Sequence, residues 1–160
     1  MLAVTLEPMT KAAYQAWLEG AVSHYAEEID GAGYAADPRQ RAKTQFAELL
    51  PQGPATPGHH LYQIRDGDGA YVGVVWLAER SPRPDMGFVY TLEVFEAFRR
   101  RGLGRDAMLA VEAEARALGC GSIALHVFGA NTPAINLYRT LGYEVTDLAM
   151  KKVLDAPPSV

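Results

Sequence analysis

The residues best suited to chemistry lie between positions 94 and 105, where three consecutive arginines precede two glycines spaced Gly-x-Gly. The residues before this stretch alternate as in a strand, and those after it have helical periodicity. A glycine-rich turn between a strand and a helix leaves several backbone N–H groups unpaired and directed at one place. The positive end of the helix dipole lies there too, so the stretch predicts a site for a phosphorylated ligand.

Two common phosphate-binding motifs do not explain this stretch. Gly102, Gly104 and Ala107 loosely fit the dinucleotide fingerprint Gly-x-Gly-x-x-Ala, but the next predicted strand, residues 123–128, ends without an acidic residue. A Walker A loop requires Gly-Lys-Ser or Gly-Lys-Thr, which the stretch lacks. The ligand is therefore expected to be neither a dinucleotide nor a nucleotide bound by a Walker loop.

Apolar periodicity predicts the elements that position this stretch. Helical spacing places helices in residues 10–33, where Gly20 is expected to introduce a break or kink, and in residues 37–50, 103–118 and 132–141. Strands are expected at residues 2–6, 60–65, 70–78, 87–94, 122–128 and, for the most part, 143–153. Residues 90–128 form a β-α-β unit, so its two strands should be parallel neighbours. The predicted fold is of the α/β (α+β) type, a mixed sheet with helices on both faces.

Length and composition indicate one globular domain. The chain has 160 residues, of which 49% are hydrophobic and 21% charged, and we expect a single domain over residues 1–154 and a tail over residues 155–160. The net charge of −4 argues against nucleic acid and membrane surfaces as partners. The first residues lack a basic, apolar leader, so a cytoplasmic location is expected. One cysteine, Cys120, excludes an intrachain disulfide.

Two motifs resemble those of one enzyme superfamily. The spacing Arg99-x-x-Gly102-x-Gly104 resembles the acyl-CoA signature of the GNAT N-acetyltransferases, Arg/Gln-x-x-Gly-x-Gly/Ala. Residues 131–143 resemble the superfamily's second CoA motif, Asn-x-x-Ala-x-x-Leu-Tyr-x-x-Leu-Gly-Phe/Tyr. The resemblance covers roughly residues 71–153, and the helices before residue 51 fit only in placement. It implies a GNAT-like, mostly antiparallel sheet with a β-α-β core that binds acyl-CoA.

The resemblance assigns acetyl-CoA as co-substrate, without a metal. Backbone amides of the turn would hold the pyrophosphate, glycines would allow close approach, and arginines would add charge. The backbone of the preceding strand would pair with the pantetheine arm as an added strand does. An asparagine at the start of the second motif would contact pantetheine or hold its loop open. The expected co-substrate residues are Val94, Arg99, Arg100, Arg101, Gly102, Leu103, Gly104, Arg105 and Asn131.

The implied reaction is direct attack of a primary amine on the thioester. By resemblance, Tyr138 is the general acid that supplies a proton to the leaving thiolate, although a tyrosine there also suits core packing. The base that takes the amine proton is left open between Glu93, His126 and a chain of water molecules. Two other functions are also compatible with the sequence, an acyl-CoA-binding sensor or interaction module without turnover and an O-acetyltransferase on the same fold.

The acceptor is expected to be an amine of a small molecule or a peptide, which the sequence does not identify. Tyr25, Glu28 and His126 are weak candidates to bind it, because aromatic and acidic groups together hold cations. His59 and His60 are adjacent, so in a strand they face opposite ways and are not expected to share a metal. Late apolar residues suit either a homodimer interface or the core; they are Val145, Leu148, Met150 and Val153.

Overall fold

A five-stranded sheet with the order β1-β2-β3-β4-β5 organises the computed structural model, which describes residues 2–33, 35–79 and 85–155. The strands are β1 (Val4–Pro8), β2 (His59–Asp66), β3 (Tyr71–Glu79), β4 (Met86–Val94) and β5 (Ser122–Leu125). Successive neighbours from β1 to β4 are antiparallel, and β4 and β5 are parallel. The predicted mixed, mostly antiparallel sheet and its parallel β-α-β pair are thus confirmed.

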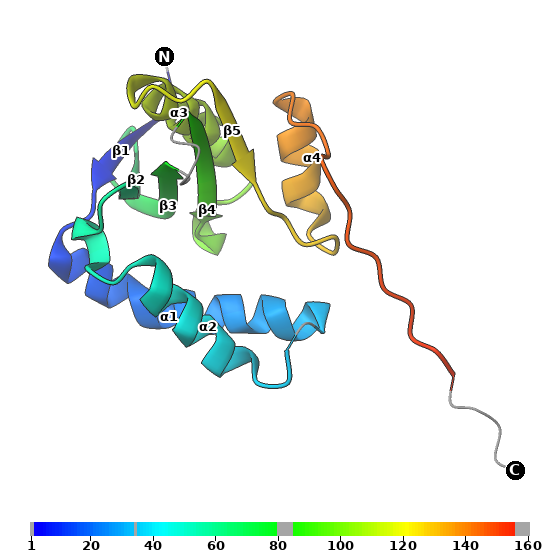
Figure 1. Ribbon diagram of the computed structural model, residues 1–160. Helices are drawn as coiled ribbons and strands as arrows, with labels where there is room; N and C mark the ends of the chain where they lie inside the picture. The colour runs from blue at the N-terminus through cyan, green and yellow to red at the C-terminus, as the bar shows by residue number, and fades with distance from the viewer. Residues whose placement is uncertain (1, 34, 80–84, 156–160) are drawn as a thin grey trace, which may run out of the picture.

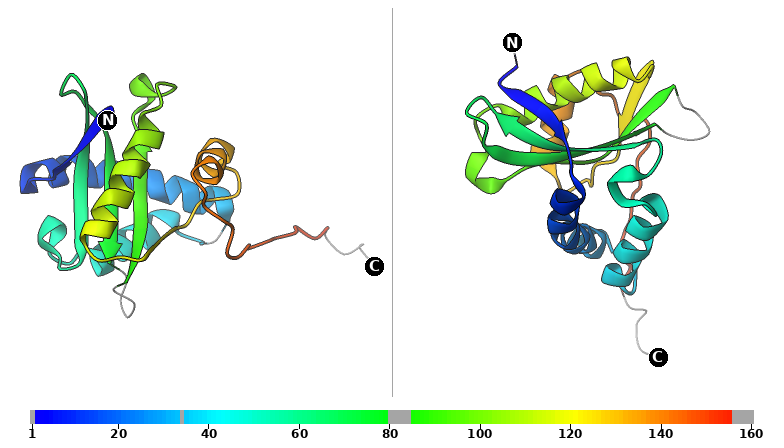
Figure 2. Two further views of the ribbon diagram at one scale, coloured as in Figure 1. Left: turned by 90° about the horizontal axis from the view of Figure 1, so that it is seen from above. Right: turned by 90° about the vertical axis from the view of Figure 1, so that its left-hand side faces the viewer.

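Helices cover both faces of the sheet, as predicted. One face is covered by α1 (Lys11–Ala32) and α2 (Pro38–Leu49), and the other by α3 (Leu103–Ala117). The last helix, α4 (Thr132–Thr140), lies beyond β5 (Figure 1). Two short 3-10 helices complete the described elements, η1 (Gly53–Ala55) and η2 (Glu96–Phe98). The right-hand view of Figure 2 shows the sheet between the two helical layers.

Local signals account for the limits of α1. The Thr10 side chain accepts a hydrogen bond from the Ala13 amide at 3.1 Å, and Gly33 ends the helix in a left-handed conformation with φ 70°. The break expected at Gly20 is wrong, because α1 is one helix of 22 residues. Glycine weakens a helix by about 1 kcal/mol but keeps its N–H, so packing of α1 on the sheet prevails.

The central strand β3 separates two hydrophobic cores. Val75 and Leu77 belong to the core under α3, whereas Val74 and Trp76 belong to the core under α1 and α2. All four side chains are almost completely buried, which is why this strand reads as a continuous apolar run. The two cores fix α1 and α3 on opposite sides of the strands that lead to the candidate site.

The neighbouring strands β4 and β5 pair over only part of their length. Their register runs from Met86 opposite Ser122 to Val89 opposite Leu125, and there β5 ends, three residues earlier than predicted. The register of β4 against β3 also shifts beyond Val89, and Tyr90 is the extra residue of this irregularity. The second half of β4 therefore continues without β5 beside it, which opens the sheet at this point.

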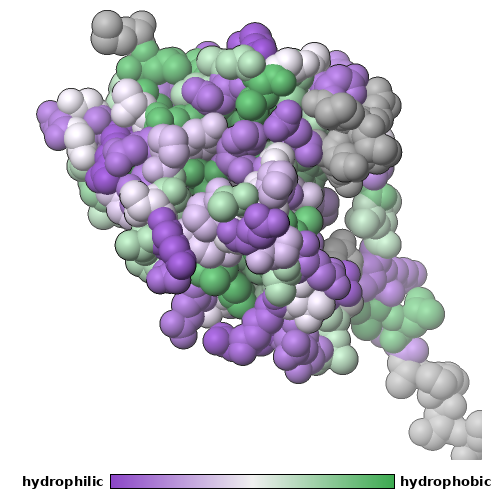
Figure 3. Space-filling view, turned by 60° about the vertical axis from the view of Figure 1, so that its left-hand side comes forward, coloured by the Kyte–Doolittle hydropathy of each residue, from purple (hydrophilic) through white to green (hydrophobic). Residues whose placement is uncertain are grey.

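The predicted final strand is wrong. Residues 143–154, here called the C-terminal arm, form no helix or strand and extend away from the body in both Figure 1 and the left view of Figure 2. A strand requires a neighbouring strand for its backbone groups, and no strand of the described residues pairs with the arm. Hydrophobic and hydrophilic surface both occur along it in Figure 3. Of the tail expected at residues 155–160, all but Asp155 lies outside the described residues.

Candidate active site

The turn between β4 and α3 presents the first amides of α3. Gly102 precedes the helix with φ 75°, a conformation that favours glycine, and no side chain caps the helix start. A Cβ at Gly102 would meet nothing within 4 Å, so open space lies before the helix. Arg100 also has a positive φ of 63°. The turn thus leaves N–H groups and the positive end of the helix dipole available to an anionic ligand.

Two of the arginines are engaged within the protein. Arg99 Nε donates a hydrogen bond to the Val94 carbonyl oxygen at 2.9 Å and so ties the turn to the end of β4. Arg101 lies 3.8 Å from the buried Asp66 carboxylate and over the Phe98 ring. Sequence reasoning missed Asp66, whose only signal is its place at the start of the Asp-Gly-Asp-Gly turn. These contacts give Arg99 and Arg101 a positioning role in the turn.

The start of α3 contacts both β4 and α4. A Cβ at Gly104 would lie 3.4 Å from the Leu137 side chain and 3.9 Å from that of Val94. Leu103 is buried in the core under α3 and anchors the helix start, while the Arg105 side chain is exposed. The helix start, the end of β4 and α4 therefore meet at one corner of the molecule.

Asn131 organises the beginning of α4. Its side-chain oxygen accepts a hydrogen bond from the Ala134 amide at 3.3 Å, so Asn131 is the N-cap of the helix. Pro133 follows in the first turn, where its fixed φ favours a helix. The side chain thus stabilises the start of α4, and the two roles predicted for it toward pantetheine stay predictions.

The structure brings together four candidate residues that lie far apart in the sequence. Glu28 of α1 interacts electrostatically with His126 and Glu93. The charge of Glu28 also acts on the hydroxyl of Tyr138. Burial raises the pKa of Glu28, and the nearby His24 and His126 oppose this shift. Burial also raises the pKa of Tyr138, with a further contribution from Glu28. Glu93 lies on the part of β4 that continues beyond β5, and His126 follows the end of β5, so the electrostatically coupled residues include both sides of this opening.

A cavity of about 600 Å³ adjoins this group. It lies between the end of α1, the loop before α4 and the C-terminal arm; its lining residues are Glu28, Gly31, Ala32, Phe128, Gly129, Ala130, Asn131, Pro133, Ala149, Met150 and Lys151. Sequence reasoning missed Phe128 and the arm residues, because no local pattern marks them. Tyr25, a weak candidate for the acceptor site, instead joins α1 to α2 through a 3.0 Å hydrogen bond to Gln45.

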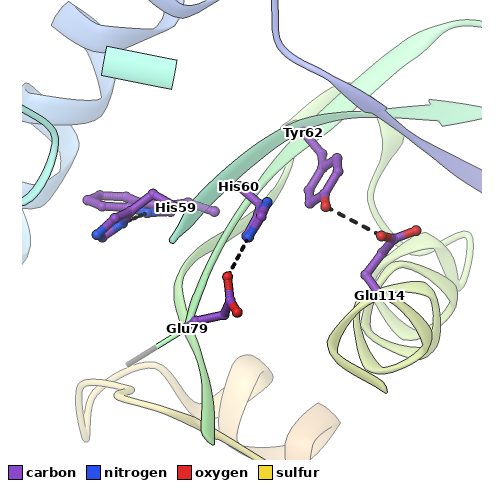
Figure 4. A network of polar contacts seen from close by, with 6 residues as sticks. His59, His60, Tyr62, Glu79 and Glu114 are labelled. Atoms are coloured by element: carbon purple, nitrogen blue, oxygen red, sulfur yellow. Dashed lines mark hydrogen bonds and ion pairs between the residues drawn. The ribbon is translucent and has the colours of Figure 1, made fainter. Parts of the chain in front are cut away.

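The adjacent histidines of β2 face opposite sides of the sheet, as predicted. His59 accepts a hydrogen bond from the Trp76 indole at 3.0 Å, among the aromatic rings under α1 and α2. His60 lies 3.1 Å from Glu79 on the other side (Figure 4). Over the residues that the structure describes, no group of three or more His, Cys, Asp or Glu is placed to hold a metal ion.

Comparison with known proteins identifies the class of protein that this fold and site define. The model of the Acetyltransferase (GNAT) family matches residues 22–143, and the chain belongs to that family. It is thus an acyltransferase of the N-acetyltransferase class, as the two motifs predict. Among the residues that the structure describes, no helix is both long and apolar enough to cross a membrane.

Individual relatives agree with this assignment. The chain is 33% identical over 156 residues to the uncharacterized N-acetyltransferase YycN of Bacillus subtilis (strain 168), covering 96% of this chain and 100% of YycN. The crystal structure of YycN superposes with a TM-score of 0.91 over 96% of this chain and 99% of that one. The structure of AAC(6')-Iy in complex with a CoA bisubstrate analog superposes with a TM-score of 0.62, covering 96% of this chain and 99% of the AAC(6')-Iy chain. At 17% identity, this likeness shows the fold alone.

Proposed function

We propose that the protein transfers an acetyl group from acetyl-CoA to a primary amine, with Tyr138 as the general acid. One observation carries this proposal, the electrostatic coupling of Glu28 to Glu93 and His126, which flank the opening between β4 and β5, and to Tyr138 of α4. These residues come from four separate segments, and the start of α3 lies at the same corner. A ligand with a phosphorylated end and a reactive thioester fits this combination.

Acetyl-CoA would bind along the opening. Its pyrophosphate would accept hydrogen bonds from the backbone amides at residues 102–105, and the exposed Arg100 and Arg105 would add positive charge. Its pantetheine arm would lie beside Val94, in the position that β5 leaves free beyond Leu125. The thioester would then approach Tyr138 of α4, whose neighbour Leu137 lies against Gly104.

The chemistry requires two proton transfers. The neutral amine attacks the thioester carbonyl carbon, a C–N bond forms, and the C–S bond breaks to release the thiolate. The amine proton passes to Glu93, His126 or water, and the thiolate receives a proton from the Tyr138 hydroxyl. Because burial and Glu28 raise the pKa of Tyr138, its hydroxyl retains the proton at neutral pH until the thiolate forms.

Glu28 is suited to hold the acceptor. It is half-buried and borders the cavity, so its carboxylate would attract an ammonium group before the amine loses its proton. The acceptor is thus proposed to be a cationic amine small enough for a cavity of about 600 Å³. The cytoplasmic location and the single domain over residues 1–154 stay predictions from the sequence.

Thiol release tests this function. The purified protein is mixed with acetyl-CoA and a panel of amines, including peptides and amino sugars, and free CoA thiol is measured with a chromogenic disulfide. Mass spectrometry of the product is expected to show an amide. An ester product would indicate O-acetylation, and CoA binding in a thermal-shift assay without turnover of any amine would favour the sensor.

A further inference from the structure

The turn that follows α4 folds the chain back onto the proposed general acid. Gly142 ends the helix with a positive φ of 93°, and its amide donates a hydrogen bond to the Arg139 carbonyl oxygen at 3.1 Å. The Tyr143 amide donates one to the Tyr138 carbonyl oxygen at 3.0 Å. These bonds form the Schellman motif, in which the residue after the glycine often contacts a side chain of the last helical turn.

The side chains of Tyr143 and Tyr138 are in contact, as this motif favours. Their ring centroids lie 5.7 Å apart, and the ring planes are inclined by 60°, close to an edge-to-face arrangement. Both side chains pack against the core under α3. Since no residue of α4 is itself buried, contacts with partly buried neighbours decide where its side chains lie. Tyr143 is such a neighbour of the proposed acid.

The hydroxyl of Tyr143 extends this contact to α3. It donates a hydrogen bond to a Glu112 carboxylate oxygen at 3.1 Å. The Glu112 side chain is only 18% exposed, and its other oxygen lies 3.8 Å from the Arg116 guanidinium, which follows one helical turn later. Burial and the charge of Glu112 raise the pKa of Tyr143, so its hydroxyl keeps its proton well above neutral pH. The bond to Glu112 is therefore maintained across the pH range of an activity assay.

This bond is one of two places at which α3 contacts α4 and its turn. At the start of α3, a Cβ at Gly104 would lie 3.4 Å from the Leu137 side chain, so α4 passes close to the backbone there. Positions 104 and 112 are about 12 Å apart along a helix, since each residue rises about 1.5 Å. Two contacts at this separation fix the direction of α4, whereas the first contact alone would leave that direction open.

We propose that Tyr143 is a positioning residue, whose hydrogen bond to Glu112 holds the ring of Tyr138 where its hydroxyl reaches the leaving thiolate. The inference rests on the proposed function, in which a proton passes from the Tyr138 oxygen to the thiolate sulfur. An acid contributes only when it lies within hydrogen-bond reach of the group that it protonates. A small displacement of the ring therefore slows the transfer. In this arrangement α3 serves both ends of acetyl-CoA, because its first turn would bind the pyrophosphate and its middle places the acid.

Replacing Tyr143 with phenylalanine tests the proposal, because the ring contact stays and the hydroxyl is lost. Phenylalanine is one of the residues of the second CoA motif at this place, so the variant is expected to fold. We expect kcat to fall several-fold, while the KM for acetyl-CoA and the CoA-induced thermal shift stay near their wild-type values. Unchanged kcat in the folded variant would overturn the proposal.

Tyr62→Phe is the matched control. It removes the other tyrosine hydroxyl that contacts a glutamate of α3, Glu114, but Tyr62 belongs to β2 and not to the turn after α4 (Figure 4). Its kcat should equal that of the wild type. A fall in kcat as large as that of Tyr143→Phe would show a general effect of such bonds on the protein and would contradict a specific role of Tyr143.

A double-variant cycle separates positioning from general stabilisation. If Tyr143 acts through the Tyr138 hydroxyl, Tyr143→Phe should lower kcat in the wild type and change it little in Tyr138→Phe. Losses that multiply in the double variant would argue against the proposal. From the side of α3, Glu112→Leu should reproduce the loss of Tyr143→Phe. Glu112→Gln should retain most of kcat, because its amide oxygen still accepts the hydrogen bond.

Hydrogen exchange tests the link between α3 and α4 without any substrate. Without the bond α4 should open more often, so amides 135–143 of Tyr143→Phe should exchange several-fold faster, while those of α1 keep their wild-type rates. Unchanged exchange of amides 135–143 would exclude the link. Faster exchange in a protein that transfers no acetyl group to any amine would contradict the proposed function and leave the link established.

Discussion

Glu28 of α1 acts electrostatically on the hydroxyl of Tyr138 in α4, although 109 intervening residues separate them in the sequence. The carboxylate adds to the effect of burial and raises the pKa of the tyrosine. Burial likewise raises the pKa of Glu28. The group proposed to attract the cationic acceptor thus also stabilises the protonated form of the proposed acid.

Replacing Tyr138 with phenylalanine removes the proposed proton donor and keeps the ring. We expect kcat to fall by about 100-fold or more, since a positioned acid contributes of that order, while the KM for acetyl-CoA changes little. Steady-state kinetics measure both quantities. Tyr62→Phe is a control, because the Tyr62 hydroxyl contacts Glu114 of α3. Equal kcat values for Tyr138→Phe and the wild type would show that Tyr138 is not the general acid.

Replacing Glu28 with glutamine should change the alkaline limb of the pH–rate profile. Activity that requires protonated Tyr138 declines as the pH rises through the pKa of that hydroxyl. Without the charge of Glu28 this pKa is lower, so the decline should begin at a lower pH. The exposed neighbour Glu27 provides a matched control as Glu27→Gln. An unshifted alkaline limb in Glu28→Gln, or the same shift in both variants, would contradict this coupling.

Replacing Gly102 with alanine should weaken CoA binding. The positive φ of 75° costs a residue with a Cβ about 1 kcal/mol or more, so the turn either relaxes or is strained. Calorimetric titration with CoA is expected to show an affinity several-fold lower than that of the wild type. Gly67→Ala is the control, since Gly67 has no positive φ and open space around it. An equal loss of CoA affinity in both variants would show that the geometry of the turn at Gly102 does not contribute to CoA binding.

Replacing Gly73 with alanine should displace the end of β4. A Cβ at Gly73 would overlap the carbonyl oxygen of Glu93, so the backbone that carries the candidate base must move. We expect a loss of roughly 1–3 kcal/mol in the free energy of unfolding, as for overpacked sites, together with reduced activity. Chemical denaturation and kinetics measure the two effects. Gly20→Ala should instead stabilise α1, because nothing lies near its Cβ position.

His59 should make the protein less stable in mild acid. Burial and the nearby His60 lower the pKa of His59 below its usual 6.5, and its Nδ1 accepts a hydrogen bond from Trp76. Below a pH of 6.5 the unfolded chain therefore binds a proton that the folded protein lacks, so the free energy of unfolding falls as the pH falls.

Urea denaturation at several pH values measures this effect of His59. His59→Gln should be less stable than the wild type at neutral pH and should lose less stability toward acid. His60→Gln leaves the burial of His59 and its bond to Trp76 in place, so it should retain the larger part of the decline caused by His59. If the free energy of unfolding of His59→Gln fell with pH as steeply as that of the wild type, another group would be responsible for the loss of stability in acid.

The sequence alone determined the local features of this protein. The start of α3 after Gly102 and the start of α4 at Thr132 depend on residues a few positions apart, so the local sequence predicts them. The parallel pairing of β4 and β5 also follows from the sequence, because a strand, a helix and a strand in succession predict it.

Only the tertiary structure decided which distant residues meet. Packing of α1 across the sheet brings Glu28 to Tyr138, and the early end of β5 creates the opening beside them. The structure also leaves the arm extended, although its composition predicts a strand, because a strand forms only where a second edge is available. Contacts between remote segments depend on how whole elements pack, and no local pattern in the sequence records that packing.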